Sequence, residues 1–149
     1  MTGAGASAGR STPERLLAWF VSLVVLHSVA VGAVMVIATE WAVAFGGWPT
    51  DGSLFFARQF GVFHFVVATA YAVEFVRYRG VTILVAAKTM AVASLGYALA
   101  IEGASWPVWL AAAGDAVMGL AAWGLHRRAF DASAPPPPRT PPAPGRIRP

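Results

Sequence analysis

The sequence has no cysteine and few charged residues, and each shortage removes a class of protein. With Cys 0, disulfides, zinc–thiolate centres and Cys-ligated iron–sulfur clusters are excluded. Charged residues make up 12% of the chain, about half of what a soluble domain carries. Hydrophobic residues make up 57%, which argues against both a disordered chain and a small water-soluble enzyme.

Four apolar segments are long enough to cross a bilayer, which takes about 20 residues. They are residues 16–38, 54–76, 81–101 and 106–125. A cleaved signal peptide is the competing interpretation of the first segment. Its apolar stretch is longer than the usual 7–15 or so residues of such a peptide, so an uncleaved helix is favoured. The sequence therefore predicts an all-α fold, an antiparallel bundle of four transmembrane helices.

The segments outside these helices carry their own signals. Residues 1–15 are rich in Gly, Ala and Ser and are expected to be mobile, although Thr12 to Glu14 could start the first helix. Residues 16–126 form the predicted transmembrane domain, and the basic, Pro-rich residues 127–149 are expected to be disordered. Ser53 and Ser105 are candidate N-caps. The short turn at residues 77–80 predicts that the second and third helices are antiparallel neighbours.

The basic residues indicate the orientation of the chain. Nine of the eleven Lys and Arg residues lie before the first helix, in the second loop or after the fourth helix. The first and third loops carry acidic residues instead. This pattern predicts that both termini and the second loop are cytoplasmic. It explains the basic pI without a nucleic-acid partner and makes anionic lipids expected partners. An Ala- and Arg-rich composition favours a GC-rich bacterium, so the expected location of this multi-pass chain is a bacterial inner membrane.

One ionisable residue lies deep in each predicted helix. The helical rise of about 1.5 Å per residue places His27, His64, Lys88 and Asp115 within roughly 8 Å of one another along the membrane normal. Lys88 and Asp115 are expected to form an ion pair, because either alone would be an uncompensated buried charge. A structural clamp is the favoured role. A proton or ion pathway is the alternative.

Further polar residues are expected nearer the two membrane surfaces. On the outer side, Arg58 is expected to pair with Glu102 or Glu40 and so tether a loop. Alternatively, Arg58 holds an anionic lipid headgroup or a substrate carboxylate. On the inner side, Tyr71 and Glu74 add polar groups to the second helix, and Glu74 is expected to pair with a nearby arginine.

Some chemistry remains open. His27 and His64, on facing helices, could ligate a b-type haem, although neutral histidines in a polar core are favoured. Asp115 or Glu74 could be the acid of a proton-coupled transporter, but the helices lack the Gly/Pro-interrupted centres of many transport sites. No HExxH motif, phosphate loop, nucleophile elbow or Walker motif is present. No catalytic residue or metal ligand is therefore predicted, and the sequence leans against an enzyme.

Two segments resemble a known family. Residues 55–64, FFARQFGVFH, and residues 114–119, GDAVMG, resemble the polar start of the second helix and the last helix of small DoxX-like bacterial membrane proteins. The resemblance covers about residues 14–128. It implies the four-helix fold more than a reaction, since most such proteins have no assigned activity. DoxX itself looks like a quinol-oxidase-associated subunit, so the resemblance implies an accessory role beside a respiratory complex.

The sequence thus predicts an integral inner-membrane protein, a non-enzymatic accessory or assembly component of a membrane complex. Its expected partners are membrane lipids and other membrane-protein subunits. The alternative is a small proton-coupled or redox-linked carrier, associated with haem or quinone, that uses His27, His64, Lys88 and Asp115.

The orientation is tested by fusing a topology reporter after Pro149. Because the basic residues lie on one side, a reporter that works in the cytoplasm is expected to be active there. A reporter inserted in the first loop, after Gly52, is expected to be active outside. If the reporter fused after Pro149 were active only on the outer side of the membrane, the predicted orientation would be wrong.

Overall fold

A computed structural model describes residues 11–102 and 105–131, apart from the side chains of Glu102 and Asp131. Within these residues the fold is all-helical. The helices are α1 (Thr12–Ile37), α2 (Thr39–Phe45), α3 (Phe55–Tyr78), α4 (Thr82–Glu102) and α5 (Trp106–Asp131). All but α2 are long and apolar enough to cross a membrane. The predicted all-α bundle with four spans is confirmed, and the chain is a multi-pass membrane protein.

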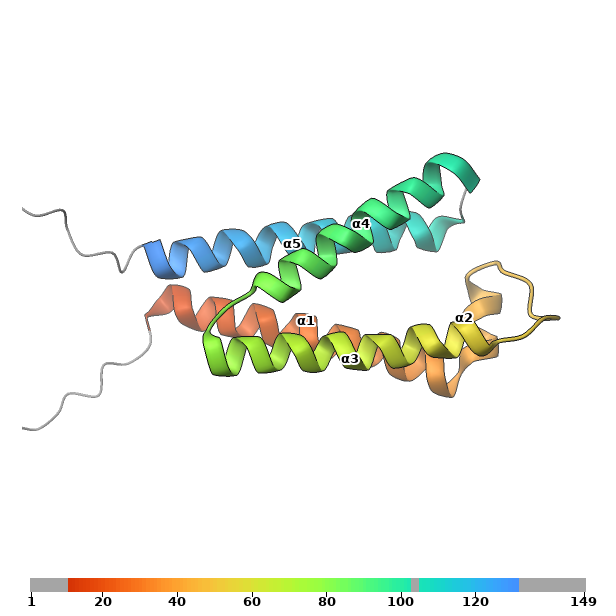
Figure 1. Cartoon of the computed structure of the whole chain (residues 1–149), viewed down its shortest axis with the longest axis horizontal. Coiled ribbons are helices and arrows are strands. Elements are labelled where there is room, and N and C mark those ends of the chain that lie inside the picture. The colour runs from red at the N-terminus through yellow and green to blue at the C-terminus, as the bar shows by residue number, and fades with distance from the viewer. Residues whose placement is uncertain (1–10, 103–104, 132–149) are drawn as a thin grey trace, which may run out of the picture.

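The long helices form two antiparallel pairs (Figure 1). α1 packs along α3, α4 packs along α5, and a smaller contact between α1 and α5 joins the pairs. α3 and α4 follow one another through a short turn, but their mutual contact is small. Figure 1 shows α4 leaving α3 beyond that turn and running beside α5. The short turn between α3 and α4 was predicted from the sequence. The helix that packs most extensively against α3, however, is α1 and not α4.

Two predicted boundaries shift. α1 begins at Thr12, so residues 12–15 are helical instead of mobile. The carboxylate of Glu14 accepts the N–H of Ser11 at 3.0 Å, which satisfies a donor at the start of the helix. α5 continues through Asp131, so residues 127–131 are helical as well. The remainder of both predicted tails, residues 1–10 and 132–149, lies outside the described residues.

The two serine caps behave differently from the prediction. Ser53 Oγ accepts the N–H of Phe55 at 3.3 Å, but Leu54 occupies the N-cap position of α3. Ser105 immediately precedes α5, and its carbonyl accepts the N–H of Val108 at 3.0 Å. Its buried hydroxyl has no hydrogen-bond partner among the described residues. Backbone geometry thus starts α5 where a side-chain cap was expected.

The most buried apolar side chains lie toward one end of the bundle, here called the terminal end, where α1 begins, α5 ends and the α3–α4 turn lies (Figure 1). The cluster contains Leu17, Val21, Val24, Tyr71, Val81, Leu84, Ala122 and Ala129. Every long helix or the turn before it contributes to this core. The four spans are therefore held together most firmly at the terminal end.

At the opposite end, here called the loop end, α1 gives way to the short helix α2. The hydroxyl of Thr39 donates to the carbonyl of Met35 at 2.7 Å and lies 3.3 Å from that of Val36. A side chain that bonds carbonyls of the preceding turn competes with the regular helix and bends it. Ala38, between the helices, has φ −120° and ψ 41°. The break at Ala38 lets α2 turn beside the start of α3.

The contact between α1 and α3 depends on two glycines. A Cβ atom on Gly61 would lie 2.9 Å from the carbonyl oxygen of Gly32, and a Cβ atom on Gly32 would lie 2.9 Å from that of Gly61. Small residues allow membrane helices to approach backbone to backbone, where packing has to replace the hydrophobic effect. These two glycines thus set the spacing of the α1–α3 pair.

Substitution Gly61→Ala is expected to destabilise the bundle by about 1–3 kcal/mol, because the added methyl group meets backbone and forces the helices apart. Gly124→Ala is the matched control, since a Cβ atom there meets nothing within 4 Å. Thermal unfolding of both variants in detergent measures the difference. Equal midpoints for the two variants would show that the glycine contact does not set the helix spacing.

Candidate functional site

The α4–α5 pair holds a buried ion pair. Lys88 Nζ lies 2.5 Å from Asp115 Oδ1, and the Lys88 and Asp115 side chains are 9% and 16% exposed. The two residues are separated by 27 positions in the sequence. Beside them, a Cβ atom on Gly119 would lie 3.2 Å from the Cβ atom of Lys88. The absence of a side chain at Gly119 therefore lets α4 approach α5 closely at Lys88. The pair expected from the sequence lies within a helix–helix contact.

Other polar groups lie within electrostatic range of this pair. Lys88, Asp115 and His27 all act on the imidazole of His64, and Asp115 acts on the phenol of Tyr71. Within the predicted intramembrane cluster, the direct contact that the structure shows is the Lys88–Asp115 pair. The residues of the cluster are not equally enclosed. Lys88 is buried, His64 is half-buried and His27 is exposed on α1.

His64 is held by its own helix. Its Nδ1 lies 2.9 Å from the carbonyl oxygen of Phe60, and its ring meets the Phe60 ring edge-on at a centroid distance of 4.3 Å. A nitrogen that bonds a carbonyl carries the proton, which leaves Nε2 as the acceptor in the neutral ring. The aligned donor and the packed ring fix the orientation of the imidazole.

Two pockets, of about 540 and 600 Å³, have neither His27 nor His64 in their lining. In addition, the residues described in the structure contain no group of three or more His, Asp or Glu side chains that could hold a metal ion. The haem alternative therefore rests on His27 and His64 themselves.

Glu74 holds the α3–α4 turn. Its buried carboxylate accepts the N–H of Thr82 at 2.7 Å and the N–H of Ile83 at 2.8 Å. These are the first amides of α4, which have no partner within the helix. The negative charge also faces the positive end of the helix dipole. Backbone amides, and not the predicted arginine, are the partners that the structure gives Glu74.

The turn itself is shaped around that carboxylate. Arg79 ends α3 in the left-handed conformation, with φ 56°, and its N–H donates to the carbonyl of Phe75. A Cβ atom on Gly80 would lie 2.9 Å from Glu74 Oε1. The backbone of the turn thus passes directly over the carboxylate, which is possible because residue 80 has no side chain.

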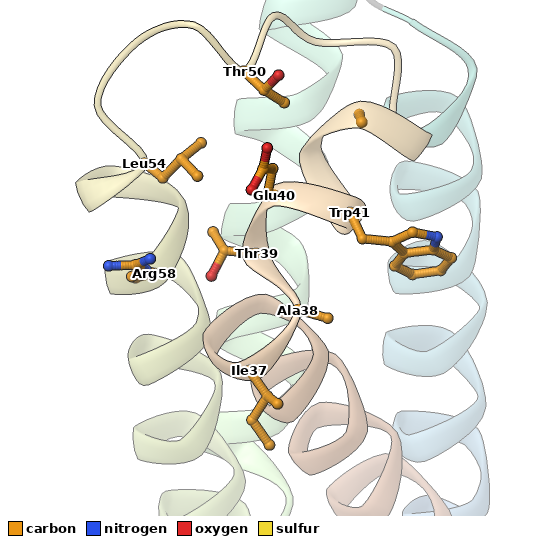
Figure 2. A pocket seen from close by; sticks show the side chains of 9 residues that line it. Ile37, Ala38, Thr39, Glu40, Trp41, Thr50, Leu54 and Arg58 are labelled. Atoms are coloured by element: carbon orange, nitrogen blue, oxygen red, sulfur yellow. The ribbon is translucent and has the colours of Figure 1, made fainter.

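The loop end contains an open pocket of about 540 Å³ between α1, α2 and the start of α3. Figure 2 shows Glu40 of α2 and Arg58 of α3 on either side of it, with Thr39 between them in this view. The residues that line it are Ile37, Ala38, Thr39, Glu40, Trp41, Ala44, Thr50, Leu54 and Arg58. Arg58 and Glu40, predicted to pair, lie on one pocket but form no ion pair with each other.

The side chain of Glu102, the other expected partner of Arg58, lies outside the described part of the structure. Some residues that line the pocket were not predicted from the sequence. Thr39 and Thr50 were not singled out, because their place in the pocket depends on the break at Ala38. A usable signal was the polar pair Thr39-Glu40 directly after an apolar span, which marks the point where a helix leaves the hydrocarbon.

Comparison with known proteins adds no assignment: no family model, curated protein or solved structure matches this chain. The resemblance to DoxX-like proteins accordingly stays a prediction from the two quoted segments.

Glu74→Gln is expected to destabilise the protein by about 1–3 kcal/mol, because the amide has one acceptor oxygen for two buried N–H donors and lacks the charge. Asp51→Asn removes an exposed loop carboxylate and is the matched control, with no expected loss. Unfolding in denaturing detergent compares the two. A stable Glu74→Gln variant would mean that the carboxylate does not hold the turn.

Proposed function

We propose that this membrane protein is a non-enzymatic accessory or assembly component of a membrane complex. The observation that carries the proposal is the Lys88–Asp115 pair. Its two charges are bonded to each other within the contact between α4 and α5. Breaking a buried pair by removing one partner is costly, because the remaining charge is uncompensated. A pair in this position fixes the register of two helices, which is what a scaffold requires.

The other buried carboxylate supports the same role. Glu74 is bonded to two backbone amides at the start of α4. Each of the two acidic side chains thus connects two helices: Glu74 connects α3 to the start of α4, and Asp115 connects α5 to α4. In contrast, large apolar side chains such as Phe56, Phe63 and Val66 of α3 are exposed along the outside of the bundle. Surfaces of this kind suit lipid chains or the spans of companion subunits.

The cellular setting is part of the proposal. One-sided basic loops favour a bacterial inner membrane with both termini in the cytoplasm. The segments of residues 55–64 and 114–119 support a DoxX-like role beside a respiratory complex, since that family includes an oxidase-associated subunit.

One observation favours a carrier as the second candidate. His64 lies within electrostatic range of Lys88, Asp115 and His27. Titratable groups that interact inside a membrane are the components of proton relays. A proton-coupled or redox-linked carrier, with haem or quinone as its redox group, would use these four residues for transfer, with the ion pair opening and closing as protons move.

Substitution of the pair separates the two candidates. Lys88→Met and Asp115→Asn are each expected to destabilise the bundle by about 3–5 kcal/mol, since each leaves a buried charge alone. The double variant is expected to recover most of that loss, because no charge remains. Unfolding in detergent gives the stabilities. Retention of companion subunits after purification in mild detergent reports the accessory role.

The control is a variant of a charge far from the ion pair. Arg77→Gln removes an exposed charge at the terminal end and is expected to change neither readout. If all variants fold equally well but Asp115→Asn and His64→Gln abolish proton flux into vesicles, the carrier replaces the accessory role. An absorption spectrum of the purified protein then shows whether the redox group is a haem.

A further inference from the structure

The pocket at the loop end carries two opposite charges that form no ion pair with any side chain described in the structure. Arg58 and Glu40 line the same cavity, and both side chains are exposed to it. Among the described residues, the ion pair of the structure is Lys88–Asp115, and neither Arg58 nor Glu40 forms one. Arg58 is one turn into α3, and Glu40 is at the start of α2. Separate backbone elements thus hold the two charges apart across one opening (Figure 2).

A ligand that fits between them must itself carry both signs of charge. The guanidinium of Arg58 presents a planar set of donors that suits the oxygens of a phosphate. The carboxylate of Glu40 accepts hydrogen bonds and suits an ammonium group with N–H donors. Thr39, whose hydroxyl hydrogen is directed at the carbonyl of Met35, offers an oxygen lone pair between the two charges.

Apart from Thr50, the remaining lining of the pocket is apolar, which points to an amphiphile. Ile37, Ala38 and Leu54 contribute side chains at the end of the first span and just before α3. Ile37 is 85% exposed, so an alkyl chain can lie against it. Trp41 also lines the pocket, and its ring stacks on Phe45 at a centroid distance of 5.2 Å. Tryptophan at the end of a span is typical of the headgroup level of a bilayer.

We propose that this pocket binds a phosphate ester that carries a primary ammonium group, as in the headgroup of phosphatidylethanolamine. Arg58 holds the phosphate, Glu40 receives the ammonium group, and the acyl chains descend past Ile37. The volume of about 540 Å³ lies in the range of about 300–1,000 Å³ that is usual for small-molecule sites. This site is independent of the accessory role proposed above.

The two charges give the site a testable selectivity. Phosphatidylglycerol has the phosphate but no cation, so it can use Arg58 and leaves Glu40 unmatched. Phosphatidylcholine has a cation without N–H donors, so it cannot donate a hydrogen bond to Glu40. The ethanolamine lipid is the member of this set that satisfies both residues.

Native mass spectrometry of the full chain, titrated with each of the three lipids, measures this selectivity. Arg58→Gln is expected to weaken binding of all three lipids about threefold or more, the scale of a partly exposed charge pair. Glu40→Gln is expected to weaken the ethanolamine lipid by a similar factor and to leave the glycerol lipid unchanged or tighter. Selectivity for ethanolamine is therefore lost in Glu40→Gln and retained in the conservative Glu40→Asp.

Arg77→Gln, which removes an arginine at the other end of α3, is the matched control and is expected to preserve the selectivity. Thermal unfolding of each variant establishes that it folds. Competition with water-soluble glycerophosphoethanolamine identifies the source of the ligand. Displacement of the lipid indicates a site for the free headgroup compound, and no displacement indicates a lipid site. Equal affinities of the unaltered chain for the three lipids, or no effect of Glu40→Gln on selectivity, would overturn the proposal.

Discussion

A charge inside a bilayer must be matched by another charge or by hydrogen bonds, and the buried charged side chains described in the structure follow that constraint. Lys88 and Asp115 match each other across α4 and α5. Glu74 is matched by the two free amides that begin α4. Both solutions involve α4, the span that packs little against the helix before it. Polar bonds thus fix α4 at its start and again at Lys88, in the first third of the helix. The bilayer is a solvent in which apolar side chains gain little from touching one another.

The two ends of the bundle are built differently. At the terminal end, apolar side chains from all four spans form a common core, with Glu74 enclosed at the edge of it. At the loop end, the two helix pairs are linked by the edge-on contact of Phe45 with Trp106, whose ring centroids are 5.4 Å apart. The pocket that contains Glu40 and Arg58 lies at this loosely joined end. Firm packing at one end therefore leaves the other free to present charged side chains.

The sequence predicted the features that depend on composition and spacing along one helix. Apolar length predicts the four spans, and helical rise places Lys88 and Asp115 at similar depth. The features it did not predict depend on the path of the backbone. Glu74 reaches the amides of α4 because Arg79 adopts a left-handed conformation and Gly80 passes over the carboxylate. Glu40 and Arg58 share a pocket, without pairing, because α1 breaks at Ala38. Residue types and periodicity do not specify these local backbone angles.

The ion pair also has a consequence for biosynthesis. Its two partners are 27 residues apart, so Lys88 leaves the ribosome first and Asp115 follows with the next span. Until α5 arrives, α4 carries a charge that its own span cannot neutralise. The pair becomes electrically neutral only when α5 packs against α4, so the final position of α4 depends on the span that follows it. A chain that stops after α4 would hold the ammonium group of Lys88 without its carboxylate partner.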